Sequence, residues 1–120
     1  MKKFDYNEYE KLDTILNDYF ESVGYDCEKV WDINFQLTYR YKDMCNNKKL
    51  DEEYVIKTIN KFVRHCKKIK DAFYYPISVQ ETLQTLILMA CYPYSEYENI
   101  KTAAYNAVHI FHTTINHPGE

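Results

Sequence analysis

The residues of this chain that are best suited to chemistry are three of its four histidines, which lie close together near the end. His109, His112 and His117 fall within the stretch HIFHTTINH. Imidazole nitrogens bind zinc and other transition metals, and they exchange protons near neutral pH. On a helix, His109 and His112 are three residues apart and therefore share one flank. This pair is a candidate for two ligands of a metal site.

A catalytic zinc site needs a third protein ligand, which is commonly another histidine or a carboxylate. His117 lies beyond the expected end of the last helix, and neither His109 nor His112 has a carboxylate three or four residues away. A histidine near a helix C-terminus also complements the negative end of the helix dipole. We therefore interpret the pair as a solvent-side flank of the last helix. A metal-binding helical-bundle enzyme remains a weaker alternative, which would need ligands from elsewhere, such as His65 or Cys66.

The remaining motifs of catalysis are missing from the sequence. The four cysteines are far apart and form no CxxC pair, a pattern typical of reduced thiols in a cytosolic protein. The chain has two glycines, Gly24 and Gly119. Glycine-rich phosphate loops and nucleophile elbows need more glycine than this, at fixed spacings. The sequence therefore favours a non-enzymatic protein over an enzyme, and it predicts no cofactor.

Charge is distributed unevenly along the chain. The first 32 residues contain nine acids and four bases, whereas residues 40–70 contain ten of the 15 bases and four acids. Lys57, Lys61, Arg64 and Lys68 recur at helical spacing and form one stripe opposite the apolar side of the same segment. Such a stripe is typical of binding to nucleic acid or to another acidic partner. The other interpretation is a solvated face, which the net charge of −3 favours.

Tyrosines gather in the two connections that flank the fourth expected helix. They are Tyr74, Tyr75, Tyr92, Tyr94 and Tyr97. Exposed tyrosines are effective interface anchors, because they bury a large area at a low cost in conformational entropy. Alternatively, they cover the two ends of the core. The sequence leaves both interpretations open.

Helical periodicity appears in five segments, which must position all of these residues. Residues 5–23 carry one apolar face, expected to lie on the core and made of Leu12, Ile15, Leu16, Tyr19, Phe20 and Val23. Residues 26–46 follow, with Asp26 as N-cap and a second start at Asp32 as an alternative. Residues 52–73 follow, with Asp51 as N-cap and an apolar face in 3-4 alternation at Val55, Ile59, Phe62, Cys66, Ile69 and Phe73. The fourth and fifth helices are expected to open with capping boxes, Ser78–Glu81 and Ser95–Glu98.

Short connections between these segments favour antiparallel packing of consecutive helices. The sequence therefore predicts an all-α fold, an antiparallel up-and-down helical bundle of four main helices plus one short or broken helix. Residues 1–120 form one domain. The fourth helix is apolar nearly all round, from Leu83 to Ala90, so we expect it to be the most central element or part of a dimer interface. The bundle is expected as a monomer or a homodimer.

No apolar run approaches the roughly 20 residues that a membrane helix needs. The first ten residues, MKKFDYNEYE, turn acidic before any apolar stretch begins, unlike a signal peptide. We therefore expect a cytoplasmic protein with no membrane partner.

The second half of the chain resembles the YppE-like family of uncharacterised helical-bundle proteins from low-GC Gram-positive bacteria. The likeness rests on a leucine-rich helix followed by a tyrosine-bearing turn, and then on the closing helix. The residues that carry it are Leu83, Leu86, Leu88, Ile100, Tyr105 and His109. The resemblance implies an antiparallel helical bundle, and it implies no assigned function or catalytic residue.

These observations together predict a non-enzymatic protein–protein interaction module. It would present helix faces or its tyrosine-rich loops to an unknown protein partner. Binding of nucleic acid or another acidic partner through the basic stripe is the alternative function.

Overall fold

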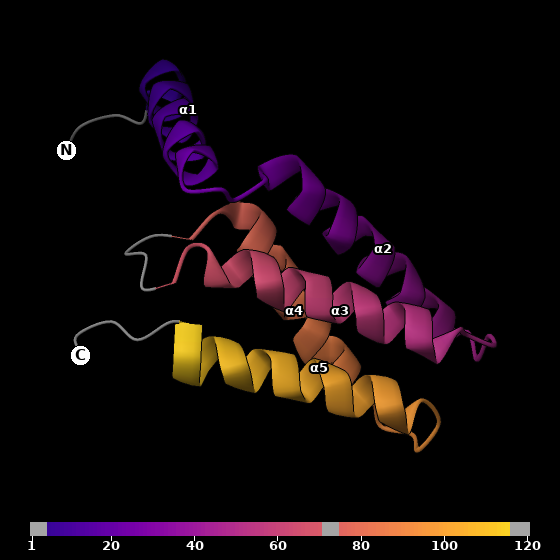
Figure 1. Cartoon of the computed structure of the whole chain (residues 1–120). Coiled ribbons are helices and arrows are strands. Elements are labelled where there is room, and N and C mark those ends of the chain that lie inside the picture. Colours follow the sequence, from indigo (N-terminus) through magenta and orange to yellow (C-terminus); the bar gives the residue numbers. More distant parts are fainter. Residues whose placement is uncertain (1–4, 71–74, 116–120) are drawn as a thin grey trace.

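A computed structural model describes residues 5–70 and 75–115 of the chain, and these residues are helical with no strand. The helices are α1 (Tyr6–Ser22), α2 (Cys27–Cys45), α3 (Glu52–Lys67), α4 (Ile77–Ala90) and α5 (Glu98–Ile110). A π-helical segment, η1 (Phe111–Ile115), extends α5. The structure confirms the predicted all-α helical bundle (Figure 1).

Helices α2 to α5 lie side by side and enclose the hydrophobic core (Figure 1). Each packs against two of the others: α2 and α5 each contact both α3 and α4. Every one of these helices turns one apolar face inward. Val30, Leu37, Ile59, Leu86 and Ile100 from these faces are completely buried.

Hydrogen bonds between helix ends define the topology of this ring. The Tyr92 hydroxyl, just after α4, donates to the Met44 carbonyl in the last turn of α2 at 3.0 Å, so α2 and α4 run parallel. The Asn99 amide donates to the Glu52 carboxylate at 3.3 Å, so α3 and α5 also start together. The predicted antiparallel contacts occur for α2 with α3 and for α4 with α5. The chain then crosses the diagonal of the ring from α3 to α4, which the expectation of neighbouring consecutive helices did not include.

Helix α4 occupies one corner of this ring, so the prediction that it is the most central element is wrong. Ile77, Ile87 and Leu88 are exposed, at 41%, 44% and 50%. In a ring of four helices each member buries one face, and the apolar side chains that α4 carries in excess of this face point outward. Its place in a dimer interface stays a prediction.

Aspartates cap three of the helices, including the caps predicted at Asp26 and Asp51. Asp5, Asp26 and Asp51 each accept a main-chain N–H in the first turn of α1, α2 and α3. Helix α2 is continuous through Asp32, without the second start. Helix α3 ends at Lys67 and residues 68–70 form a turn, so the helix is shorter than the predicted 52–73; residues 71–73 lie outside the described residues.

The two predicted capping boxes are wrong. Helix α4 begins at Ile77, and Ser78 is buried in its first turn, where its hydroxyl lies 2.8 Å from that of Tyr25. Helix α5 begins after Tyr97, whose backbone is left-handed and whose hydroxyl donates to the Lys48 carbonyl at 2.6 Å. Neither helix has a side-chain cap, and in both places the side chain bonds to another part of the fold.

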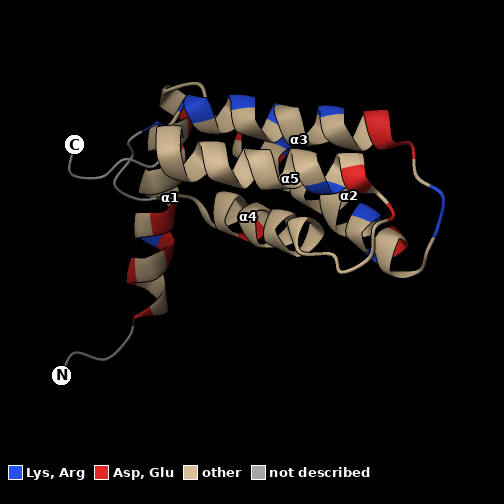
Figure 2. Ribbon diagram, turned by 90° about the horizontal axis from the view of Figure 1, so that it is seen from below, with Lys and Arg blue, Asp and Glu red and all other residues tan. Residues whose placement is uncertain are grey.

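Helix α1 stands apart from the bundle (Figures 1 and 2). Phe20 is its one buried side chain, and Leu16 is half-buried against the core. These two residues meet the first turns of α2 and α4 around a small hollow to which Trp31 and Ile77 also contribute. The expectation that the whole apolar face of α1 lies on the core is therefore wrong for the other members of that face.

Candidate interaction surfaces

The apolar residues of α1 that miss the core form a stripe along its outer side. Leu12, Ile15, Tyr19 and Val23 are 61%, 63%, 57% and 42% exposed. They follow one another at spacings of three or four residues and therefore lie on one side of the helix. We call these four residues the α1 stripe. Surface helices of this length normally bury such a stripe, so the α1 stripe is a candidate binding surface.

The same helix is strongly acidic. Residues 5–22 contain six acidic residues and one basic residue, Lys11, and so carry a net charge of −5. Figure 2 shows Asp and Glu at several levels of α1, between its start and the bundle. A partner for the α1 stripe must therefore combine an apolar surface with positive charge.

The basic stripe predicted from the sequence is exposed on the outer side of α3. Lys57, Lys61, Arg64 and Lys68 are all exposed, and Figure 2 shows basic residues at regular intervals along this helix. Lys57 lies 3.7 Å from the carboxylate of Glu53 in an exposed ion pair. Lys61, Arg64 and Lys68 have no carboxylate within ion-pair distance among the residues that the structure describes. Three of the four cations are thus available to an acidic partner.

His65 lies at the edge of the basic stripe, on the side of α2. Its Nδ1 atom is buried and has no hydrogen-bond partner in the described parts of the chain. Burial lowers the pKa of His65, and the charges of Lys68 and Lys29 lower it further. The neutral imidazole is therefore favoured here, because a proton on Nδ1 would find no acceptor.

An aromatic row on α2, which the sequence reasoning missed, lies on the outer face of that helix. Phe35 and Tyr39 are 56% and 58% exposed, and Trp31 is half-buried. The rings of Trp31 and Phe35 stack with their centroids 6.0 Å apart, and the Lys42 ammonium lies 5.6 Å from the centre of the Tyr39 ring. The spacing of four residues between these aromatic side chains is the feature of the sequence that could have indicated the row. The same spacing in the sequence is also typical of core residues.

The five tyrosines of the predicted interface do not form one exposed surface in the structure. Tyr75 and Tyr92 pack at opposite ends of α4: the Tyr75 hydroxyl donates to the Ile115 carbonyl at 3.4 Å, and Tyr92 is 6% exposed. Tyr97 is half-buried beside Tyr92, with ring centroids 5.8 Å apart. Tyr94 is 62% exposed, and Tyr74 lies outside the described residues. Three of the five tyrosines therefore cover the ends of the core.

The histidine pair is exposed on the flank of the last helix. His109 stacks on the ring of Tyr105 with centroids 6.2 Å apart, and His112 is exposed next to Phe111. His117 lies outside the residues described. Within residues 5–70 and 75–115, no group of three or more His, Cys, Asp or Glu side chains is placed to hold a metal ion.

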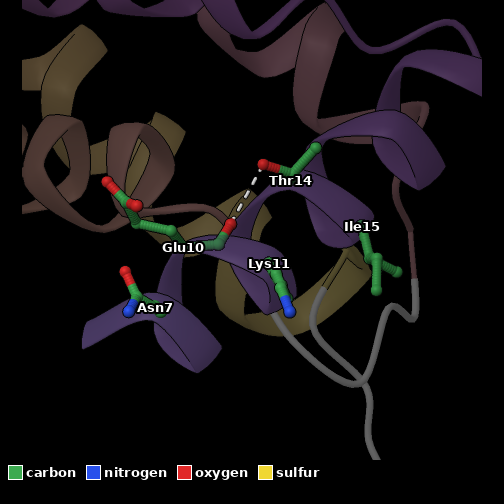
Figure 3. Close-up of a pocket in the computed structure, with 5 residues that line it drawn as sticks. All are labelled: Asn7, Glu10, Lys11, Thr14 and Ile15. Carbon is green, nitrogen blue, oxygen red and sulfur yellow. Dashed lines mark hydrogen bonds between the residues drawn. The ribbon is translucent and has the colours of Figure 1, made fainter. Parts of the chain in front are cut away.

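A hollow of about 620 Å³ lies on the polar side of α1 and reaches the α1 stripe at Ile15 (Figure 3). Among the described residues it is lined by Asn7, Glu10, Lys11, Thr14 and Ile15. The Thr14 hydroxyl donates to the Glu10 carbonyl at 3.0 Å, a bond within the helix. All five residues come from one helix, and their side chains bring together no acid–base pair or nucleophile that would define a catalytic centre.

Comparison of the chain with protein-family models, with curated proteins and with solved structures found no match. In the described part of the chain, none of the helices has the length and apolar character needed to cross a membrane.

Proposed function

We propose that this protein is a non-enzymatic interaction module that binds a protein partner through the α1 stripe. The observation that supports this function is the exposure of Leu12, Ile15 and Tyr19, each more than half exposed along one side of a helix that stands off the bundle. An amphipathic helix that places its apolar side in a groove of a partner is a recurrent mode of recognition, and its anchors have this spacing.

The stability of the bundle does not depend on the α1 stripe. The core is built from α2 to α5, and α1 adds to it mainly through Phe20 and Leu16. Full burial of a Leu or Ile side chain stabilises a protein by about 1.5–3 kcal/mol. Leu12 and Ile15 are still mostly exposed, so most of this stabilisation would be gained only when a partner covers them.

The test is affinity capture from the native cell, with bound proteins quantified by mass spectrometry. Leu12→Ala with Ile15→Ala is expected to lower capture of a specific partner at least about tenfold, as loss of interface anchors does. Lys11→Ala with Thr14→Ala, on the polar side of the same helix, is the matched control and should capture as the unaltered chain does. Equal capture by both double variants would contradict the proposal.

Binding of a nucleic acid or another acidic partner is the second candidate function. The exposure of Lys57, Lys61, Arg64 and Lys68 along α3 favours it. Phosphate contacts make such binding strongly dependent on salt. Salt-sensitive retention on DNA or heparin, lost on Lys61→Glu with Arg64→Glu, is the expected result, and retention that is indifferent to salt would contradict this function.

We also propose membership of the YppE-like family, on the residues of α4 and α5 that resemble it. This assignment adds no activity and leaves the two candidate functions unchanged.

A further inference from the structure

The aromatic row of α2 and the basic stripe of α3 form one continuous surface. Tyr54, three residues before Lys57, donates its hydroxyl proton to the side-chain oxygen of Gln36 at 3.0 Å, across the outer edge between the two helices. Tyr39 lies three residues after Gln36 and is therefore its neighbour on α2, and the Tyr54 ring is itself 50% exposed. The surface is therefore aromatic on the side of α2 and cationic on the side of α3.

This surface is complementary to α1 in charge. Residues 57–68 contain five basic residues and no acid, whereas residues 5–22 carry a net charge of −5. Two α1 helices would repel each other, which excludes a direct pairing of one α1 stripe with another. The surface on α2 and α3 offers the apolar contact and the positive charge that α1 needs.

The two surfaces also match in length. Leu12 to Val23 and Lys57 to Lys68 each span eleven residue steps, or about 17 Å of helix. Within one chain they do not meet along their length, because Phe20 anchors α1 at the end of the bundle and the helix extends away from it (Figures 1 and 2). A second copy has no such restriction.

We propose that two copies of this chain form a dimer in which α1 of each lies on the aromatic row and basic stripe of the other. The α1 stripe contacts Phe35, Tyr39 and Tyr54, and Asp18 beside it faces Lys61 and Arg64. The arrangement is isologous, because each copy gives one α1 and receives one. This inference rests on the proposed function, for which it names the partner.

The test uses sedimentation of the full chain over a concentration series at low salt. The unaltered chain should reach the mass of a dimer, and added salt should weaken the dimer because it screens the charges. The basic-stripe variant, Lys61→Glu with Arg64→Glu, should raise the dissociation constant about tenfold or more. The acid variant, Asp18→Lys, should do the same, because Asp18 lies three residues after Ile15 and flanks the α1 stripe. Its change lies near the end of α1, where positive charge does not disfavour the helix.

Mixing the two variants provides the decisive result. Each variant alone places like charges on both surfaces, but a mixture of the two restores both attractions and should form a heterodimer. Controls are Lys48→Glu with Lys49→Glu, and Glu81→Lys, each with the same charge change as its variant. These three residues are exposed and belong to none of α1, the aromatic row and the basic stripe, so both control variants should dimerise as the unaltered chain does.

Three outcomes would overturn the dimer. The first is a monomer at all concentrations, the second is a dimer that neither variant weakens, and the third is a failure of the mixture to associate. If the chain is monomeric and the Leu12→Ala, Ile15→Ala variant still loses capture of a different protein, the proposed function stands and the second copy is not the partner. If that variant also captures as the control does, both proposals fail.

Discussion

Two buried polar side chains show how single residues depend on their tertiary contacts. Burial raises the pKa of Tyr25, whose hydroxyl lies 2.8 Å from that of Ser78 inside the core. Both hydroxyls have a partner, so burial costs little free energy. The Nδ1 atom of His65 has no such partner among the described residues, and its burial therefore penalises the protonated form.

The stability of the protein should depend on pH through His65. Burial, Lys68 and Lys29 lower its pKa in the folded state, against a smaller opposite effect of Asp26, whereas the unfolded chain has the ordinary value of about 6.5. Below that pH the unfolded state binds more protons, so the free energy of unfolding falls. Above about pH 6.5, His65 is neutral in both states and no longer lowers the free energy of unfolding.

The measurement is the thermal midpoint between pH 7.5 and pH 5.5 for the unaltered chain and for His65→Gln. We expect the midpoint of the unaltered chain to fall more steeply over this range, because the variant has no imidazole to protonate. His109→Gln, at an exposed position on α5, is the control and should keep the slope of the unaltered chain. An equal slope for His65→Gln would show that His65 does not penalise protonation.

At the scale of the helices, the sequence predicted well which segments are helical. It predicted less well which helices and side chains contact one another. The 3-4 alternation of Val55, Ile59, Phe62 and Cys66 placed the buried face of α3, and all four are buried. The aspartate caps were readable because they act within one turn of their own helix. Ser78 was misread because its partner, Tyr25, is 53 residues away.

Helix α1 shows the limit of periodicity most clearly. Its apolar spacing is as regular as that of α3, yet Leu12, Ile15 and Tyr19 are exposed and Phe20 is buried. Periodicity reports that a face is apolar but not what covers it. The aromatic row on α2 is the reverse case, since Phe35 and Tyr39 resemble core residues in sequence and lie outside. The basic stripe could be predicted because charged side chains at that spacing have only solvent or a partner to face.

At the scale of the whole molecule, charge and topology separate the acidic α1 from the basic α3. The diagonal connection places α4 beside α2, so that α3 keeps an outer face uncovered by the following helix. Three hydrogen-bonded pairs of residues define this arrangement along α2 and α4, namely Tyr25 with Ser78, Asn34 with Thr82, and the Met44 carbonyl with Tyr92. The pairs advance in the same direction along both helices, which is possible only if the helices are parallel.

These three pairs should therefore give side-chain nuclear Overhauser effects in the folded protein. Isotope filtering separates them from contacts between copies, so the result holds whether or not the chain dimerises. In a ring in which every consecutive pair of helices is in contact, α2 and α4 would lie on a diagonal, so these effects would be missing and effects between α3 and α4 would appear. That result would contradict the diagonal connection.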